Sequence, residues 1–540
     1  MESKKYFGVM LDMSRNGVMK PEQVKEYALT VKKLGYNMIQ LYTEDTYEIP
    51  EEPYFGYLRG RYSKEELKDI VAYCNSIDIE VIPCIQTLAH LNQIFYWREF
   101  KEIRDLNDVL LVDDERTYDL IDKMFRSLRE CFTSDLIHIG MDEAHDLGRG
   151  KYLDLHGNKS SYEIIKGHLD RVSQLAKKYG FHPIMWSDMF YRIVNNGEYF
   201  SNDPNIITDE IAASCPEGID QVYWSYCREK KEEYATMLES HKKFGGESWF
   251  AGGAWTWMGF ASNNEFSLAT MLPAMQACRE KDVQNIMLTM WGDFGKLCSY
   301  YAVLPSLYAI RRFYDGVEDI EQIKKEFGEI TNESFDDMMK LDIRVDVGQV
   351  DHMFSTTPYT YLLFNDPLMG MVDAHIKESR RKEFEEAAEY FENAAKASKY
   401  QSIFKSQAAL CRALAVKYDL GVRTRKAYKA KDMDALKVIC DDYLLTMERI
   451  EEFLRCFRKL WFEENKPHGI DVTEIRIGAV LTRLRFARER LLSFMAGEVE
   501  KIDELDEEIL LFRGEGCNGV NFEQLPALKD WKWIASPNII

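Results

Sequence analysis

Two adjacent acidic residues, Asp142 and Glu143, directly follow an apolar segment of strand length at residues 136–140. A short apolar run of this kind is typical of a buried parallel strand. Acids that come just after such a strand lie at the edge of the sheet where these folds carry out their chemistry. Two neighbouring carboxylates are costly to ionise together in a dry site, so one of them tends to keep its proton. The pair therefore predicts acid catalysis, with Glu143 as the proton donor and Asp142 as its partner.

The elements that would position this pair alternate between strands and helices over the first part of the chain. Apolar runs predict eight strands, at residues 6–11, 37–42, 80–85, 136–140, 182–186, 221–224, 249–252 and 285–290. Periodicity and capping residues predict helices at 21–34, 63–77, 115–131, 161–179, 229–244, 266–281 and 300–313. The helix expected after the fifth strand, within 203–214, has no clear periodicity.

Eight strand–helix units predict a (β/α)8 TIM barrel, which we assign to residues 1–316. A doubly wound sheet is the alternative, but that fold usually has a glycine-rich phosphate loop after its first strand. Here the first strand is followed by Asp12-Met13-Ser14-Arg15, which is no such loop. Four long amphipathic segments then follow, at 371–400, 402–430, 433–461 and 472–499. They predict an α-helical C-terminal domain over 317–540, built as an antiparallel bundle.

Functional side chains of a barrel lie just after its strands. The residues at these positions are mostly acidic or aromatic: Asp12, Arg15, Glu44, Asp45, His90, Asp142, Glu143, Trp186, Asp188, Trp224, Tyr226, Trp255, Trp257, Trp291 and Asp293. Five of the ten tryptophans belong to this set, which is hard to explain by core packing alone. Aromatic walls combined with carboxylates that hold hydroxyl groups predict a carbohydrate pocket.

Several of these side chains also have purely structural explanations. These alternatives are a core histidine at 90, capping acids at 44 and 45, and an ion pair between Arg15 and Asp12. For Asp142 and Glu143 the alternative is a surface turn, which the apolar strand before them disfavours.

Charge and composition argue against other classes of partner. The formal charge of -21 disfavours nucleic acids and anionic membrane surfaces. No stretch reaches the roughly 18 apolar residues of a membrane span, and the N-terminus has no apolar signal region. The 11 cysteines include no Cys-x-x-Cys pair, so we expect reduced thiols in a cytoplasmic protein. We expect neither a metal nor a cofactor.

The fourth-strand segment His138-Ile139-Gly140-Met141-Asp142-Glu143 resembles the His-x-Gly-x-Asp-Glu signature of glycoside hydrolase family 20, the β-N-acetylhexosaminidases. Further barrel segments resemble that family in the same order. Residues 8–15 are similar to its first-strand segment, Tyr42-Thr43-Glu44-Asp45 to Leu-Thr-Asp-Asp, and Leu88-Ala89-His90 to Pro-Gly-His. Trp186-Ser187-Asp188 is similar to Trp-Asp-Glu, and Trp291-Gly292-Asp293 to Trp-x-Glu.

The resemblance implies an exo-acting enzyme that removes terminal β-linked GlcNAc or GalNAc by a retaining, substrate-assisted mechanism. Glu143 would be the acid and then the base, while Asp142 would orient the acetamide and stabilise the positive charge of the oxazolinium ion. Glu44 and His90 would tune Glu143. The remaining expected contacts are Trp186, Trp224 and Trp291 around the acetamide and sugar, Asp293 on a hydroxyl group, Tyr226 on the acetamide, and Arg15, Trp255 and Trp257 elsewhere in the substrate site.

The chain also departs from the better-known members of that family. Those members have an α/β domain before the barrel and an arginine where Phe7 stands here. Their strand-seven loop supplies an aspartate and a tyrosine, whereas this loop reads Ala254-Trp255-Thr256-Trp257. These departures leave the hydroxyl contacts and the acetamide tyrosine open, and they favour a short intracellular subgroup with a helical C-terminal domain.

Two other functions remain as alternatives at this point. One is a metal-dependent barrel hydrolase such as a deacetylase, and the other is a sugar-binding protein that has lost catalysis. In the leading interpretation the partner is a carbohydrate with a terminal N-acetylhexosamine. The oligomeric state stays open, with a homodimer as one alternative.

Overall fold

The computed structural model describes residues 4–343, 345, 358–376 and 379–512 of the 540-residue chain. These residues form two compact units. Unit 1 consists of residues 1–254, 267–291 and 306–331, and unit 2 of residues 255–266, 292–305 and 332–540.

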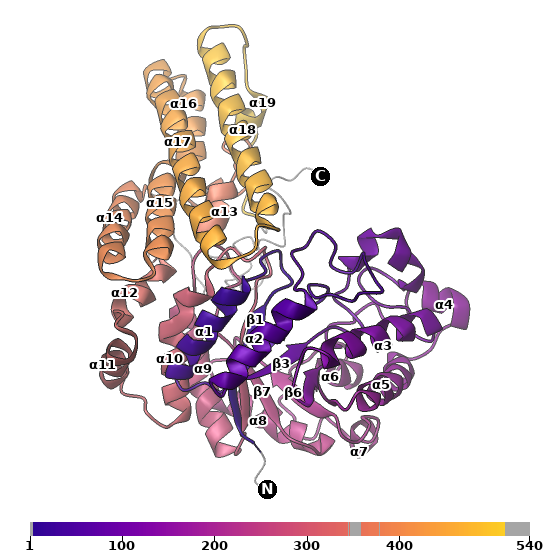
Figure 1. Ribbon diagram of the computed structural model, residues 1–540. Coiled ribbons are helices and arrows are strands. Elements are labelled where there is room, and N and C mark those ends of the chain that lie inside the picture. Colours follow the sequence, from indigo (N-terminus) through magenta and orange to yellow (C-terminus); the bar gives the residue numbers. More distant parts are fainter. Residues whose placement is uncertain (1–3, 344, 346–357, 377–378, 513–540) are drawn as a thin grey trace. The chain divides into compact units, whose positions relative to one another are not determined.

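Eight parallel strands close into a barrel in unit 1, each strand pairing with the next in the sequence and the last with the first. Figure 1 shows the barrel and its helices in indigo to pink. The strands are β1 (Tyr6–Asp12), β2 (Met38–Tyr42), β3 (Glu80–Cys84), β4 (Leu136–His138), β5 (His182–Trp186), β6 (Asp220–Trp224), β7 (Trp249–Gly253) and β8 (Asn285–Met290). The predicted TIM barrel is confirmed.

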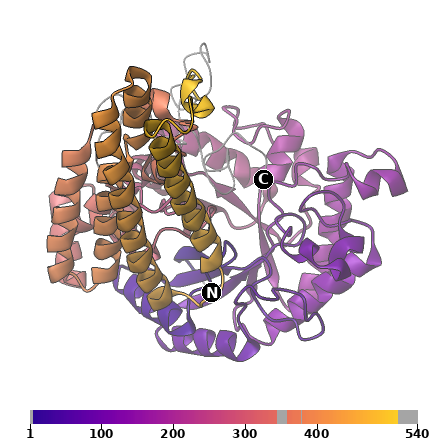
Figure 2. The same ribbon diagram turned by 90° about the horizontal axis from the view of Figure 1, so that it is seen from above.

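The strands are apolar on both faces because the barrel interior is packed and helices cover the outside. Every residue of β2 and β8 is buried. Figure 2 shows the helices arranged around the strands. They are α1 (Pro21–Lys33), α2 (Lys64–Ser76), α3 (Glu115–Arg129), α4 (Lys151–His156), α5 (Ser161–Lys178), α6 (Asp188–Val194), α7 (Asp209–Ala212), α8 (Lys231–His241), α9 (Asn264–Glu280), α10 (Leu304–Tyr314) and α11 (Ile320–Thr331).

The region after β5 differs from the prediction. The helix expected within 203–214 is reduced to the four residues of α7. A longer helix, α6, begins instead at Asp188, two residues after the strand ends. Its seven residues are too few to show a clear helical period, and Asp188 looks like a loop residue in the sequence.

Unit 2 is a helical bundle, as predicted. Its helices are α12 (Phe335–Met339), α13 (Pro358–Phe364), α14 (Arg381–Ala397), α15 (Gln401–Lys417), α16 (Leu420–Ala430), α17 (Met433–Glu464), α18 (Ile470–Met495) and α19 (Asp503–Asp506). Helix α15 packs against α14 and α17, and α17 packs against α16 and α18. The predicted segment 402–430 is two helices, and α14 begins ten residues later than the predicted segment 371–400.

The units divide the chain differently from the predicted boundary at 316. Helix α11 belongs to unit 1, where Glu326 accepts hydrogen bonds from Tyr308 and Arg312 of α10. The segments after β7 and β8, residues 255–266 and 292–305, belong to unit 2. Within that unit the Phe260 ring lies 5.0 and 5.5 Å from those of Phe453 and Phe457.

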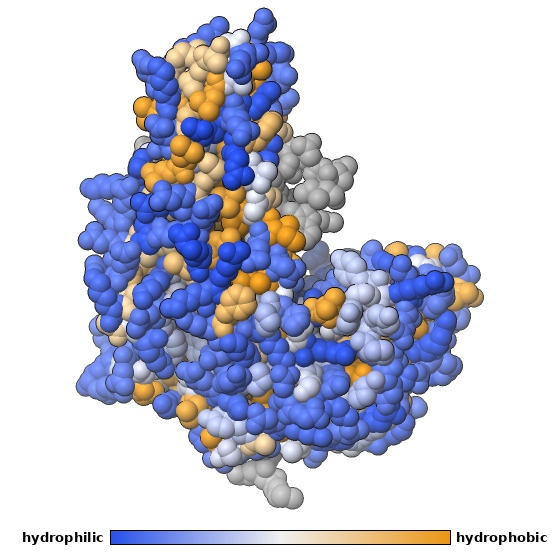
Figure 3. Space-filling view, turned by 45° about the horizontal axis from the view of Figure 1, so that its top comes forward, coloured by the Kyte–Doolittle hydropathy of each residue, from blue (hydrophilic) through white to orange (hydrophobic). Residues whose placement is uncertain are grey.

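Hydrophilic residues cover most of the visible face of unit 1, in the lower part of Figure 3, and hydrophobic residues are scattered there. Among the described helices, none combines the length and the apolar character needed to cross a bilayer.

Candidate active site

The chain leaves β4 through a strained turn that carries the two predicted catalytic acids. Gly140, Met141 and Glu143 have positive φ values of 73°, 72° and 52°. For a residue with a side chain this conformation costs about 1–3 kcal/mol, and it persists mainly at functional sites. A Cβ atom on Gly140 would lie 2.7 Å from the backbone carbonyl oxygen of Ile85 and 2.1 Å from Oε1 of Gln86, so only glycine fits there. The turn ends β4 two residues earlier than predicted.

Asp142 is buried and held by two side chains. Nε2 of Gln86 donates to its Oδ1 at 2.8 Å, and Nε2 of His90 lies 3.2 Å from its Oδ2. Burial would raise the pKa of Asp142, but the charge of His90 and hydrogen bonds from His90 and Gln86 lower this pKa to about 2. Asp142 is therefore a carboxylate at any ordinary pH.

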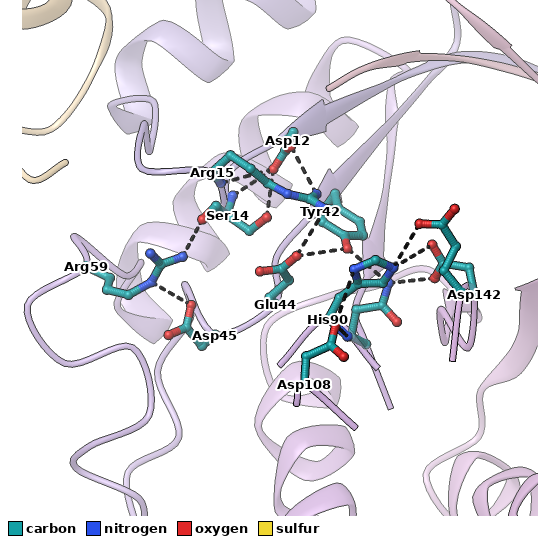
Figure 4. A network of polar contacts seen from close by, with 12 residues as sticks. Asp12, Ser14, Arg15, Tyr42, Glu44, Asp45, Arg59, His90, Asp108 and Asp142 are labelled. Atoms are coloured by element: carbon teal, nitrogen blue, oxygen red, sulfur yellow. Dashed lines mark hydrogen bonds and ion pairs between the residues drawn. The ribbon is translucent and has the colours of Figure 1, made fainter. Parts of the chain in front are cut away.

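His90 is the positive partner of Asp142 (Figure 4). Burial would lower the pKa of His90, but the Asp142 charge raises it to about 9. The His90 backbone N–H donates to Oδ2 of Asp108 at 3.1 Å, and its Nε2 also lies 3.8 Å from Oε2 of Glu143. A charged imidazolium thus lies within 4 Å of both predicted catalytic acids.

The two adjacent acids do not share one environment. The side chain of Glu143 is 41% exposed, whereas that of Asp142 is 12% exposed. The Glu143 backbone N–H donates to Oδ2 of Asp188 at 3.1 Å, and Nη2 of Arg192 lies 3.8 Å from Oε1 of Glu143. The Glu143 carboxylate therefore lies between two cations, His90 and Arg192.

Asp188, a third acid next to the pair, has a raised pKa. Burial and the charges of Asp142 and Glu143 raise the pKa of Asp188 to about 7, against the lowering effect of Arg192. Nε of Arg192 donates to Oδ2 of Asp188 at 3.1 Å. The buried Oδ1 of Asp188 has no hydrogen-bond partner among the described residues. Arg192 and Gln86 are not among the residues predicted from the sequence, although the i, i+4 spacing of Asp188 and Arg192 on α6 was an available signal.

Replacing Asp188 by asparagine should change the pH dependence of stability. Because the folded pKa is raised to about 7, the neutral carboxyl stabilises the fold fully below about pH 4, and this stabilisation is lost as the pH rises through about 7. The difference between the Tm of Asp188→Asn and the Tm of the wild type should therefore shift in favour of the variant by about 2 °C or more as the pH rises from about 5 to about 8. Thermal unfolding at several pH values measures this, with the exposed Asp170→Asn as the matched control. A constant difference between Asp188→Asn and the wild type would contradict the assignment.

A second group of side chains joins the ends of β1 and β2 (Figure 4). The guanidinium of Arg15 lies 3.1 Å from Oδ2 of Asp12 and 3.4 Å from Oε1 of Glu44. The Tyr42 hydroxyl donates to Oε1 of Glu44 at 3.1 Å and accepts from Nε2 of Gln86 at 3.0 Å. Burial raises the pKa of Glu44, and the charges of Arg15 and His90 oppose this. A continuous polar chain thus runs from Arg15 to Gln86 and on to Asp142.

Asp45 faces away from this chain of contacts. Its carboxylate accepts from Nε of Arg59 at 2.9 Å, and Arg59 also donates to the backbone carbonyl of Ser14 (Figure 4). Asp45 and Arg59 therefore fasten the segment after β2 to the segment after β1.

Aromatic side chains line the same end of the barrel. The Trp186 ring lies 6.2 Å from that of Trp291, and the Trp224 and Tyr226 rings stack at 5.3 Å. The guanidinium of Arg15 lies 5.0 Å from the Trp291 ring, within cation–π range. The buried indole N–H groups of Trp186 and Trp224 have no acceptor among the described residues.

Tyr226 lies within electrostatic reach of the acid pair. Burial raises its pKa, hydrogen bonds with Trp291 and Thr289 oppose this, and the charges of Asp142 and Glu143 add to the increase.

Seven of the ten predicted substrate residues belong to unit 1: Arg15, Glu44, His90, Trp186, Trp224, Tyr226 and Trp291.

The other three predicted substrate residues, Trp255, Trp257 and Asp293, belong to unit 2. The Trp255 and Trp257 rings stack on each other at 4.2 Å, and the Phe266 ring meets that of Trp255 edge-on at 4.8 Å. Asp293 is exposed.

Comparison with known proteins matches two family models to this chain. The model for the glycosyl hydrolase family 20 catalytic domain matches residues 5–209, and the model for the glycoside hydrolase 20C C-terminal domain matches residues 333–521. Together the two models match more than half of the chain.

Among curated relatives, hexosaminidase D from Bos taurus is 25% identical over 311 residues, covering 51% of this chain and 82% of the relative. Hexosaminidase D from Homo sapiens is 26% identical, covering 36% of this chain and 40% of the relative. Among solved structures, the Streptomyces plicatus N-acetyl-β-hexosaminidase in complex with Thio-NAglucal aligns with a TM-score of 0.45 and 19% identity, covering 60% of this chain and 68% of that one.

Proposed function

Because the chain belongs to glycoside hydrolase family 20, we propose that it is an exo-acting β-N-acetylhexosaminidase that removes terminal β-linked GlcNAc or GalNAc. The observation that carries this proposal is the different environment of the two adjacent acids. Asp142 is buried and held ionised beside His90, whereas Glu143 is half exposed. The names of the bovine and human relatives support the same activity.

The environment of Asp142 supports a role towards the acetamide group. In the substrate-assisted mechanism the acetamide carbonyl attacks the anomeric carbon and forms an oxazolinium ion, with retention of configuration. A permanently ionised carboxylate can accept the acetamide N–H and stabilise the positive charge that develops on the ring. Because Gln86 and His90 hold Asp142 before substrate binds, little reorganisation is needed at the moment of reaction.

The environment of Glu143 supports a role as general acid and base. Its side chain is exposed enough to meet the glycosidic oxygen, and in its protonated form it would give that oxygen a proton as the aglycone leaves and become a carboxylate. It would then take a proton from the water that opens the oxazolinium ion. His90 and Arg192 would position the Glu143 carboxylate, and Asp188 would hold its backbone through the Glu143 N–H.

The other predicted site residues take supporting roles in this proposal. Trp186, Trp224 and Trp291 would wall the acetamide and the sugar face, and Tyr226 would donate to the acetamide carbonyl. Arg15 and Glu44 would hold the polar chain that ends at Asp142. Trp255, Trp257 and Asp293 belong to unit 2, and their contacts with the substrate stay predictions from the sequence.

A panel of nitrophenyl β-glycosides tests the proposed function. The protein should hydrolyse the GlcNAc or GalNAc derivative and leave the glucoside, which lacks the acetamide, almost untouched. A thiazoline-type inhibitor should bind tightly, because it mimics the oxazolinium ion. Hydrolysis of the glucoside at a similar rate, without inhibition by the thiazoline, would contradict the proposal. The same panel decides between GlcNAc and GalNAc.

We also propose that the protein works in the reducing cytoplasm. This proposal is supported by the cysteines, since the ten that the structure describes are free thiols.

A further inference from the structure

We propose that the segments after β2 and β3 carry a binding surface for the aglycone, the part of the saccharide that leaves. We call this surface, formed by Tyr54, Tyr57 and Trp97, the aromatic platform. The inference rests on the proposed function, because it takes the substrate to be a saccharide with a terminal N-acetylhexosamine.

The three rings of the aromatic platform touch one another and still face solvent. Tyr54 and Tyr57 have ring centroids 5.8 Å apart, and Trp97 lies 5.4 Å from Tyr54 and 5.2 Å from Tyr57. Both tyrosines are 43% exposed. Rings that pack only to form a core are buried, so a cluster with this much open ring surface suits a ligand that stacks on it.

The backbone beneath the platform holds the rings in place. Phe55, the chain neighbour of Tyr54, is buried, and its ring lies 6.4 Å from that of the buried Phe100. Gly56 has a φ of 67°, and a Cβ atom there would lie 2.0 Å from the carbonyl oxygen of Asp45. The backbone at Gly56 therefore lies directly against that of Asp45, three residues after the end of β2. A platform on rigid backbone loses little conformational freedom when it binds a ligand.

The platform is joined to the candidate active site through His90. The loop that contains Trp97 begins at His90 and closes at Asp108, where the backbone N–H groups of His90 and Leu91 both donate to Asp108, at 3.1 and 3.2 Å. The loop is also tied to the segment after Glu143, because the Asn107 side-chain amide donates to Asp146 at 2.5 Å. Trp97 of the platform thus lies on the loop that begins at His90, and Nε2 of His90 lies 3.8 Å from the carboxylate of Glu143.

A pocket on the same loop, lined by aromatic and polar side chains, supplies hydrogen-bonding groups. It has a volume of about 260 Å³ and is lined by Asn92, Phe95, Tyr96, Arg104 and Asn107. Tyr96 is 82% exposed and precedes Trp97 in the chain. Amide and guanidinium groups bind hydroxyls, and aromatic rings bind the C–H faces of sugars, so the pocket and the platform together match saccharide chemistry.

The position of these groups indicates which part of the saccharide they bind. The proposed acid, Glu143, protonates the oxygen that links the terminal sugar to the aglycone, so the aglycone leaves from the side of Glu143. His90 and the segment after Glu143 are the two points at which the platform loop is fastened. We therefore assign the platform to the sugars beyond the scissile bond and not to the terminal N-acetylhexosamine.

Kinetics on two kinds of substrate test this assignment. The wild type and the variants Tyr54→Ala/Tyr57→Ala and Trp97→Ala are assayed with a nitrophenyl glycoside and with the best oligosaccharide from a panel that differs in linkage. The ratio of kcat/KM for the oligosaccharide to kcat/KM for the nitrophenyl glycoside should fall about tenfold in both platform variants. Tyr162→Ala, on α5, is the control and should leave this ratio unchanged.

Direct binding separates this inference from the proposed function. The same oligosaccharide is titrated into Glu143→Gln protein with and without the platform substitutions, and the substitutions should weaken binding about tenfold. Unchanged binding and an unchanged kinetic ratio would overturn the aglycone assignment while leaving a working hexosaminidase. Wild-type protein that cleaves no N-acetylhexosaminide would instead overturn the proposed function, and the titration would still decide whether the platform binds saccharide.

Discussion

Replacing Glu143 by glutamine should lower kcat for a nitrophenyl N-acetylhexosaminide by about a hundredfold to ten-thousandfold. The amide keeps the shape of the side chain but can neither protonate the glycosidic oxygen nor activate water. Substrate affinity should change far less, because Glu143 contacts the reacting atoms and not the bulk of the sugar. Steady-state kinetics and calorimetric titration of an uncleaved oligosaccharide measure the two quantities separately.

The matched control for this experiment is Glu102→Gln, an exposed surface carboxylate that should leave kcat unchanged. A nitrophenolate leaves readily without protonation, so the loss should be larger on an oligosaccharide than on the nitrophenyl substrate. Turnover of Glu143→Gln at the wild-type rate on both substrates would show that another residue supplies the proton.

The barrel could be predicted from the sequence because its elements have strong local signals. Each strand is an apolar run, and Ser63 with Glu66 forms the capping box that starts α2. Residues at the strand ends follow directly once the strands are known, so Asp142, Glu143 and His90 could be found. What the sequence pattern does not contain is the conformation of the turn after β4. Positive φ values at Met141 and Glu143 separate the environments of two acids that are neighbours in the chain.

Gln86 could not be recognised from local patterns, and the only local signal for Arg192 was its i, i+4 spacing from Asp188. Gln86 follows β3 among apolar residues and looks like part of the core. Its role depends on the pairing of β3 with β4 through Cys84 and His138, which brings Gln86 within 2.8 Å of Asp142. Arg192 matters because α6 begins directly after β5, where a short helix has no clear period.

The division of the strand-end segments between the two units could not be predicted from the sequence either. Trp255 and Trp257 follow β7 as the barrel rule requires, and yet their segment belongs to unit 2. The cause is packing between residues far apart in the chain, such as Phe260 with Phe453 and Phe457. No local sequence pattern predicts contacts between residues so far apart in the chain. For the same reason the meeting of Tyr54 and Tyr57 with Trp97 could not be foreseen.

The proposed role of Asp142 leads to a second large expected effect. Asp142→Asn should lower kcat/KM for N-acetylhexosaminides by about a hundredfold to a thousandfold, because a neutral amide no longer stabilises the oxazolinium charge. If Asp142 acts on the acetamide, the loss of kcat/KM should be much smaller for a substrate that lacks this group. The slow residual hydrolysis of that substrate by the wild type and by Asp142→Asn gives this comparison. An equal loss on both substrates would argue against the substrate-assisted mechanism.

Asp142→Asn should also change the pKa of His90, which would not happen if Asp142 had only a structural role. The Asp142 charge is the main cause that raises the pKa of His90, to about 9, against the lowering effect of burial. Removing that charge should let the His90 pKa fall towards or below its ordinary value of about 6.5, so the imidazolium should lose its proton well below pH 9. NMR titration of the His90 ring follows this directly, with the buried His168, which contacts Tyr118 and not the acid pair, as the reference signal. A His90 midpoint that stays near 9 in Asp142→Asn would mean that other charges, such as Glu44 and Glu143, hold the proton, and that Asp142 is not its main partner.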